Sequence, residues 1–205
     1  MKKIFQSLII LLLLVSISKA QSLRIGPAVG FTAVQESGIF GPSMPDLDNN
    51  LHYGVKAKLS LPMLPLKIQA HVIYTSFEGS GNAIPPIFSS LTKTDVKVET
   101  SLLSIGIGGE WALIPGPVQP YIAADFLISS FGDTDISYSN IYDVSTSGES
   151  RYGLGIGAGV DFKLLPTIDV DLTLKYNFNN LIGKEDWEDN FNTINLTANI
   201  LFGIL

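Results

Sequence analysis

Hydrophobic and polar side chains alternate at every second position in eight separate segments of the chain. A period of two residues is typical of a β-strand with one apolar and one polar face, and no helical periodicity follows the first twenty residues. The segments are Leu23–Thr32, Leu51–Leu61, Leu66–Phe77, Leu103–Leu113, Tyr121–Phe131, Arg151–Leu164, Ile168–Phe178 and Thr193–Ile204. The pattern predicts an all-β chain of eight strands.

The connections between these segments alternate between short and long. Three of them are short and contain proline: PMLP, IPGPVQP and PTID. The other four are longer and rich in Gly, Ser, Asn and Asp: residues 33–50, 78–95, 132–150 and 179–192. Tight turns at one end and long loops at the other are typical of an antiparallel up-and-down meander.

The two faces of each predicted strand differ in charge. The apolar faces carry no Asp, Glu, Lys, Arg or His, whereas the opposite faces carry seven basic and five acidic residues. These are Arg24, Lys56, Lys58, Lys67, Arg151, Lys163, Lys175, Glu110, Asp125, Asp161, Asp169 and Asp171.

A soluble β-sandwich or a lipocalin would also alternate, with its apolar face inward. Two features favour the reverse orientation. The aromatic residues of the apolar faces gather near both ends of the strands, as in the girdles of a membrane barrel, and the opposite faces are rich in small residues. Since every backbone amide must be paired in lipid, the sheet has to close. We therefore expect an eight-stranded antiparallel up-and-down transmembrane β-barrel.

Four glycines occupy alternate positions in the segment RYGLGIGAGVDFKL, at 153, 155, 157 and 159. A dinucleotide-binding fingerprint would space its glycines by two and then three residues and would open a helix. Here the spacing is two throughout, so the glycines share one face of a strand. We interpret that face as an inner wall that leaves room for long side chains in a narrow lumen.

The first twenty residues differ from the rest of the chain. Lys2 and Lys3 precede an unbroken apolar run from Leu8 to Val15, and Ser18-Lys19-Ala20 supplies the small residues of a cleavage site. Residues 1–20 are therefore predicted to be a cleaved signal peptide, and residues 21–205 the barrel domain. Eight apolar residues are too few for a spanning helix, which needs about 20.

Charge and composition exclude several function classes. Without the three lysines of residues 1–20, 10 basic and 19 acidic residues remain, a formal charge of −9. Nucleic acid is not an expected partner, because phosphate neutralisation requires clustered Lys and Arg. The chain contains no cysteine, which excludes disulfides and thiolate metal sites. We expect no cofactor and no metal.

The segments RYGLGIGAGVDFKL, VDLTLKYNF and NLTANILFGIL resemble the small eight-stranded outer membrane β-barrel family of Gram-negative bacteria, often labelled porin-family proteins. The barrel of outer membrane protein A is of this type. The resemblance implies residence in the cell outer membrane, contact with outer-membrane lipid and lipopolysaccharide, insertion by the outer-membrane assembly machinery, and a monomer. Such barrels usually end on an outward aromatic residue. Here Phe202 and Ile204 keep the outward register and Leu205 does not.

The inward charges are predicted to gather toward the short turns and to pair with one another, because an unpaired buried ion costs several kcal/mol. The predicted structural cluster comprises Arg24, Lys58, Lys67, Glu110, Asp125, Asp161, Lys163, Asp169 and Asp171. We interpret this cluster as an ionic plug that closes the lumen. The function expected is structural or surface-interacting, with a narrow porin-like transporter of small or hydrophobic solutes as the alternative.

A lipid-modifying outer-membrane enzyme is the less favoured third reading. Catalysis would need a histidine with a Ser or Asp partner near the outer rim. The chain has two histidines, His52 and His71, and both are predicted to point inward. A lone inward histidine is more often a hydrogen-bonded filler than a base, so no enzyme activity is expected.

Two local features complete the sequence interpretation. The apolar phase shifts between Val96–Val98 and Leu103–Ile107, which predicts a bulge near Leu102–Leu103. The second long loop is unusually apolar, with Ile84, Ile87, Phe88 and Leu91, and could cover the barrel mouth or bind a partner.

Overall fold

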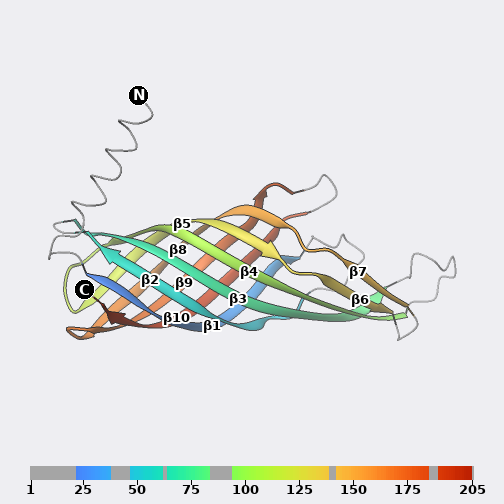
Figure 1. Ribbon diagram of the computed structural model, residues 1–205, viewed down its shortest axis with the longest axis horizontal. Coiled ribbons are helices and arrows are strands. Elements are labelled where there is room, and N and C mark those ends of the chain that lie inside the picture. The colour runs from blue at the N-terminus through green and yellow to red at the C-terminus, as the bar shows by residue number, and fades with distance from the viewer. Residues whose placement is uncertain are drawn as a thin grey trace, which may run out of the picture.

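Ten β-strands make up the regular structure of the described residues in a computed structural model of the chain (Figure 1). The structure describes residues 22–37, 47–61, 64–83, 94–138, 142–184 and 189–204. The strands are β1 (Leu23–Ser37), β2 (Asn50–Ser60), β3 (Leu66–Ala83), β4 (Thr94–Ala112), β5 (Val118–Phe131), β6 (Thr134–Tyr138), β7 (Tyr142–Thr146), β8 (Ser150–Leu165), β9 (Ile168–Ile182) and β10 (Phe191–Gly203). No helix in these ranges is long and apolar enough to cross a membrane.

Eight of the strands form a closed antiparallel barrel. Around the ring the order is β1, β2, β3, β4, β5, β8, β9, β10, and β1 pairs with β10 to complete it. Each strand pairs with its sequence neighbour, apart from the β6–β7 hairpin inserted between β5 and β8. The predicted eight-stranded up-and-down barrel is therefore confirmed. The start of β1 and the end of β10 lie together at the end with the short turns (Figure 1).

The two faces of the barrel wall have the predicted polarity. Apolar side chains such as Val29 (58% exposed) and Ile107 (59% exposed) point outward, whereas His52 (0%) and Glu110 (1%) point into the lumen. Outward aromatics also pair across strands: the ring centroids of Tyr53 and Tyr74 lie 5.5 Å apart. An apolar exterior around a polar interior is stable only when lipid surrounds the wall.

The bulge predicted near Leu102–Leu103 is wrong. Strand β4 pairs without a register shift along β3 and β5, and Val96, Val98 and Leu102 all point inward. The apolar phase changes because β4 continues beyond the outward apolar band into a region where apolar side chains face the interior. The register shifts occur elsewhere, between Val34 and Glu36, and at both ends of the β8–β9 pairing.

Those inward apolar residues belong to a core at the long-loop end of the barrel. We call it the outer core; its buried members are Leu47, Phe77, Val96, Val98, Leu102, Ile136 and Phe191. Ile136 lies on β6, which pairs with the first half of β4 and with β7. Residues 132–150, predicted to be a plain loop, therefore contain a β-hairpin that extends the sheet and packs an apolar side chain into the outer core.

Several sequence predictions lie outside the described residues. They are the signal peptide at 1–20, the apolar second loop with Ile84, Ile87, Phe88 and Leu91, and the C-terminal Leu205. These stay predictions.

Candidate functional site

The inner wall of the barrel combines glycines with large polar side chains. Several glycines stand directly opposite a large inward residue on the neighbouring strand: Gly159 opposite Tyr121, Gly106 opposite His71, Gly30 opposite His52, Gly157 opposite Lys175 and Gly155 opposite Asp125. A Cβ added at Gly159 would overlap the Tyr121 ring, and one at Gly106 would overlap the His71 ring. The glycines therefore provide the space that the lumen side chains occupy.

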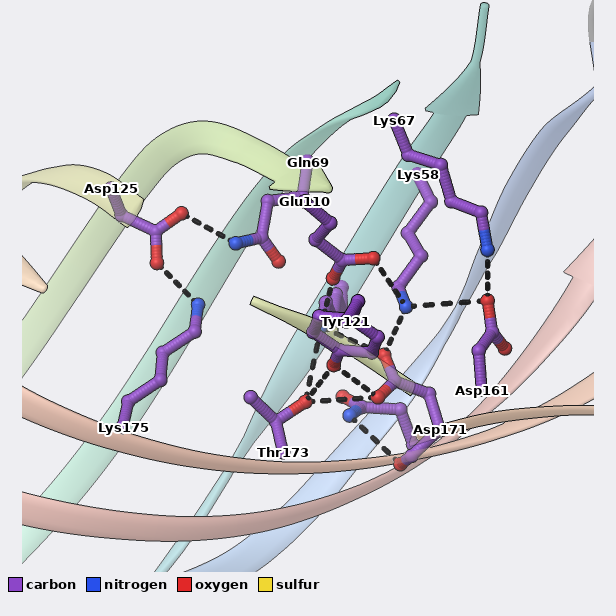
Figure 2. A network of polar contacts seen from close by, with 12 residues as sticks. Lys58, Lys67, Gln69, Glu110, Tyr121, Asp125, Asp161, Asp171, Thr173 and Lys175 are labelled. Carbon is purple, nitrogen blue, oxygen red and sulfur yellow. Dashed lines mark hydrogen bonds and ion pairs between the residues drawn. The ribbon is translucent and has the colours of Figure 1, made fainter. Parts of the chain in front are cut away.

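Two lysines of β2 and two carboxylates form the centre of the lumen network. Lys56 Nζ lies 2.8 Å from both Glu110 Oε1 and Asp171 Oδ2. Lys58 Nζ lies 2.8 Å from Glu110 Oε2 and also pairs with Asp171 (Figure 2). All four side chains are at most 4% exposed, so each charge depends on its partners for stabilisation.

Tyr121 of β5 connects this centre to β9. Its hydroxyl donates to Asp171 Oδ1 at 2.6 Å and lies 2.7 Å from the Thr173 hydroxyl (Figure 2). The Lys58 ammonium lies 4.7 Å from the centroid of the Tyr121 ring, within the range of a cation–π contact. The ring thus fills the lumen beneath the lysines while its hydroxyl fixes Asp171.

Three further ion pairs surround the centre. Lys67 of β3 pairs with Asp161 of β8 and also donates to Gln119 at 3.0 Å. Arg24 of β1 lies 2.7 Å from Asp169 of β9, the strand next to β8.

Lys175 of β9 pairs with Asp125 of β5, which also accepts a hydrogen bond of 2.6 Å from Gln69 (Figure 2). With these pairs, five basic residues meet five acidic residues in the part of the lumen that the structure describes. The basic ones are Arg24, Lys56, Lys58, Lys67 and Lys175, and the acidic ones are Glu110, Asp125, Asp161, Asp169 and Asp171.

The structure brings eight of the nine residues of the predicted cluster into this network: Arg24, Lys58, Lys67, Glu110, Asp125, Asp161, Asp169 and Asp171. Lys163 lies apart, since its side chain is exposed at the short-turn end. Lys163 is two residues from the inward Asp161 and would also point inward on a regular strand. The β8–β9 pairing, however, shifts register between Lys163 and Leu165.

The predicted cluster also omits three residues that belong to the lumen network. Lys56 and Lys175 belong to the inward faces, and Tyr121 has the phase of Asp125, so strand phase alone could have found all three. Phase could not show which groups pair. Lys67 and Glu110 are direct cross-strand neighbours, yet Lys67 reaches to Asp161 and Glu110 to the β2 lysines.

Both histidines lie inside the barrel. His52 is completely buried; its Nδ1 lies 2.8 Å from the Thr32 hydroxyl and its Nε2 lies 3.0 Å from the Thr197 hydroxyl. His71 is 6% exposed and faces Gly106. His52, the rim candidate for a catalytic base, has both ring nitrogens engaged by hydroxyls. This is the geometry of a hydrogen-bonded filler.

The fold and the polar lumen agree with a comparison against known families. The model of the family described as outer membrane protein beta-barrel domain matches residues 7–202. The chain belongs to this family. Membership in the outer membrane protein beta-barrel domain family places the protein in the outer membrane, the environment that its apolar exterior requires.

Solved structures of small outer membrane barrels share this fold. OprG from Pseudomonas aeruginosa has a TM-score of 0.54 at 14% identity, with 89% of this chain and 93% of that chain covered. Neisserial surface protein A has a TM-score of 0.51 at 18% identity, with 90% and 97% covered. A major outer membrane protein from Thermus thermophilus has a TM-score of 0.51 at 14% identity, with 90% and 100% covered. No curated protein matches the sequence.

Proposed function

We propose that this family member is a non-conducting outer-membrane barrel with a structural or surface-interaction role. The observation that carries the proposal is the pairing of Lys58 with Asp161, 3.6 Å apart. Their strands, β2 and β8, are four positions apart in either direction around the ring of eight, so the pair crosses the lumen. Together with the Tyr121 ring, this network occupies the cross-section of the barrel.

The outer core is a second barrier at the other end of the lumen. Val98 is completely buried and Phe77 and Phe191 are each 1% exposed, with their ring centroids 6.0 Å apart in an edge-to-face arrangement. Between such side chains an ion loses its hydration and a water molecule finds no hydrogen-bond partner. A solute would have to displace this apolar layer before it reached the ionic one.

The cavity that the described residues form in the middle of the lumen is small. A cavity of about 20 Å³ lies among Lys56, His71, Asn195 and their neighbours on β9 and β10. Such a volume holds one water molecule, for which roughly 10–15 Å³ is sufficient. This space does not accommodate a transported solute, which supports the sealed barrel over the narrow transporter.

Conductance of the refolded protein in planar lipid bilayers tests this proposal. The wild-type protein is expected to give no single-channel steps at any applied voltage, because both barriers span the lumen. An open porin inserted into the same bilayers is the positive control. Reproducible steps from the wild-type barrel would contradict the seal and favour the transporter.

The hydrogen bonds of both His52 ring nitrogens argue against a role as a lipid-modifying enzyme. We expect His52→Ala to leave the lipid A mass spectrum of expressing cells unchanged, because neither ring nitrogen is free to act as a base. Cells that carry the empty vector are the control for host modification. A lipid A species present with the wild-type protein and absent with the variant would establish an enzymatic role.

A surface role is supported by the charge and the extension of the long-loop end. Eight exposed acidic residues and two exposed lysines lie there among the described residues: Asp48, Glu78, Asp95, Glu99, Asp133, Asp135, Glu149 and Asp189, with Lys97 and Lys184. The β6–β7 hairpin, which pairs with the first half of β4, extends this surface at the long-loop end (Figure 1). The proposed partners are outer-membrane lipid and lipopolysaccharide, with the assembly machinery during biogenesis. The proposed oligomeric state is a monomer.

A further inference from the structure

The short-turn end of the barrel is unusually apolar for a set of turns. Turn residues are mostly polar in a solvated loop. Here the turns and the adjoining strand ends expose large aliphatic side chains, each more than half exposed: Leu64, Leu113, Ile114, Leu164 and Leu165. An apolar ring of this kind is stable where the turns meet lipid.

A cavity of about 480 Å³ opens within this ring. Residues 60 and 64–67 line one side and the β4–β5 turn lines the other, and the amide of Ala112 joins the two by donating to the Pro65 carbonyl at 2.7 Å. Its size falls within the roughly 300–1,000 Å³ typical of a small-molecule site. Leu64, Leu66, Trp111 and Leu113 are the large apolar side chains of its lining.

The charged part of the lining is cationic. Lys67 and Lys163 both line the cavity, and no Asp or Glu belongs to its lining. The Lys67 ammonium is already paired with Asp161, whereas Lys163 is exposed and lies outside the ion pairs of the described residues. The cavity therefore joins an apolar wall to one accessible positive charge.

The charge of the two ends supports an anionic occupant. Lys163 is the one exposed charged residue at the short-turn end among the described residues, and the opposite end carries the excess of exposed acids. An anion is therefore repelled from one end of the molecule and attracted to the other. Because the apolar turns place this end at the membrane boundary, an anion that also carries acyl chains fits the cavity best.

We propose that this cavity binds an anionic phospholipid of the leaflet that faces the short turns. Its phosphate lies at the Lys163 ammonium. Its acyl chains run along Leu66, Trp111 and Leu113 on the outer wall. The site shares Lys67 with the edge of the lumen network, but it lies at the short-turn end and its existence does not depend on whether the barrel conducts.

Native mass spectrometry of the detergent-solubilised full chain tests the site, with phosphatidylglycerol and phosphatidylethanolamine of matched acyl chains as probes. The wild-type protein is expected to retain phosphatidylglycerol preferentially. Lys163→Gln is expected to lower that retention about fivefold, the effect of one lysine near an anionic lipid surface. Lys97→Gln, which removes an exposed lysine at the opposite end, is the matched control and leaves retention unchanged.

A second variant examines the apolar wall. Leu113→Asn is expected to lower the retention of both lipids, because it places an amide against the acyl chains. Both Lys163 and Leu113 are exposed, so neither change disturbs the packed interior. Equal retention of the two lipids by the wild-type protein, or equal effects of Lys163→Gln and Lys97→Gln, would overturn the proposal.

Discussion

Asp171→Asn is expected to lower the free energy of unfolding of the barrel by about 3–5 kcal/mol, the usual cost of removing one partner from a buried ion pair. Asp171 is completely buried and contacts Lys56, Lys58 and the Tyr121 hydroxyl. After the substitution Glu110 is the close partner of both lysines, and Asp161 contacts Lys58 at the longer distance of 3.6 Å. Urea unfolding in lipid vesicles, followed by tryptophan fluorescence, measures the change.

Two further variants show whether the loss comes from the unpaired charge. Asp135→Asn removes an exposed acid at the long-loop end and should leave the unfolding midpoint unchanged. Lys58→Met combined with Asp171→Asn removes one charge of each sign, so the double variant should be more stable than Asp171→Asn alone. Equal midpoints for wild-type and Asp171→Asn would mean that the lumen is wet enough to screen these charges.

Gly159→Leu is expected to prevent the barrel from folding, or to destabilise it by about 3 kcal/mol, the upper range for overpacking a close-packed interior. A Cβ at this position overlaps the Tyr121 ring. The ring cannot move aside without loss of the hydrogen bonds from its hydroxyl to Asp171 and Thr173. The folded fraction after dilution from urea into lipid vesicles, measured by far-ultraviolet circular dichroism, checks this result.

The neighbouring residue supplies the control for Gly159. Ala158 lies on the same strand and points outward, so Ala158→Leu adds the same side chain to the lipid face and should fold normally. Tyr121→Ser together with Gly159→Leu removes the overlap with the ring, though not the approach to the Leu172 carbonyl oxygen, and should recover part of the folding yield. Normal folding of Gly159→Leu alone would show that Tyr121 does not need the space beside Gly159.

Strand periodicity predicts the barrel because the two faces of its wall meet very different environments, lipid on the outside and a polar lumen on the inside. A shift of one residue in any strand would move its charged side chains into lipid and its apolar ones into the lumen. This is why phase alone predicts the inward direction of Lys58, Asp171 and His52. Phase likewise assigns the glycines of β8 to the inner face, where they stand opposite Tyr121, Asp125 and Lys175.

Periodicity fails where the environment of the wall changes along a strand. In β4 the apolar side chains point outward at Leu103 and Ile107 but inward at Val96 and Val98. The phase shift predicts a bulge only if apolar side chains face lipid along the whole strand. Beyond the membrane band the extended strands instead enclose an outer core, and the β6–β7 hairpin adds Ile136 to it.

The sequence by itself determined the class of the protein, the number of barrel strands and most of the polar side chains that share the lumen, since all three depend on an alternation that each strand carries locally; Lys163 is the exception in the predicted cluster. Only the tertiary structure decided which charges meet. Lys67 and Glu110 face each other across adjacent strands, yet the shear of the closed barrel brings Asp161 within reach of Lys67 and the two β2 lysines within reach of Glu110. Pairing across the lumen depends on barrel closure and tilt, which no single strand encodes.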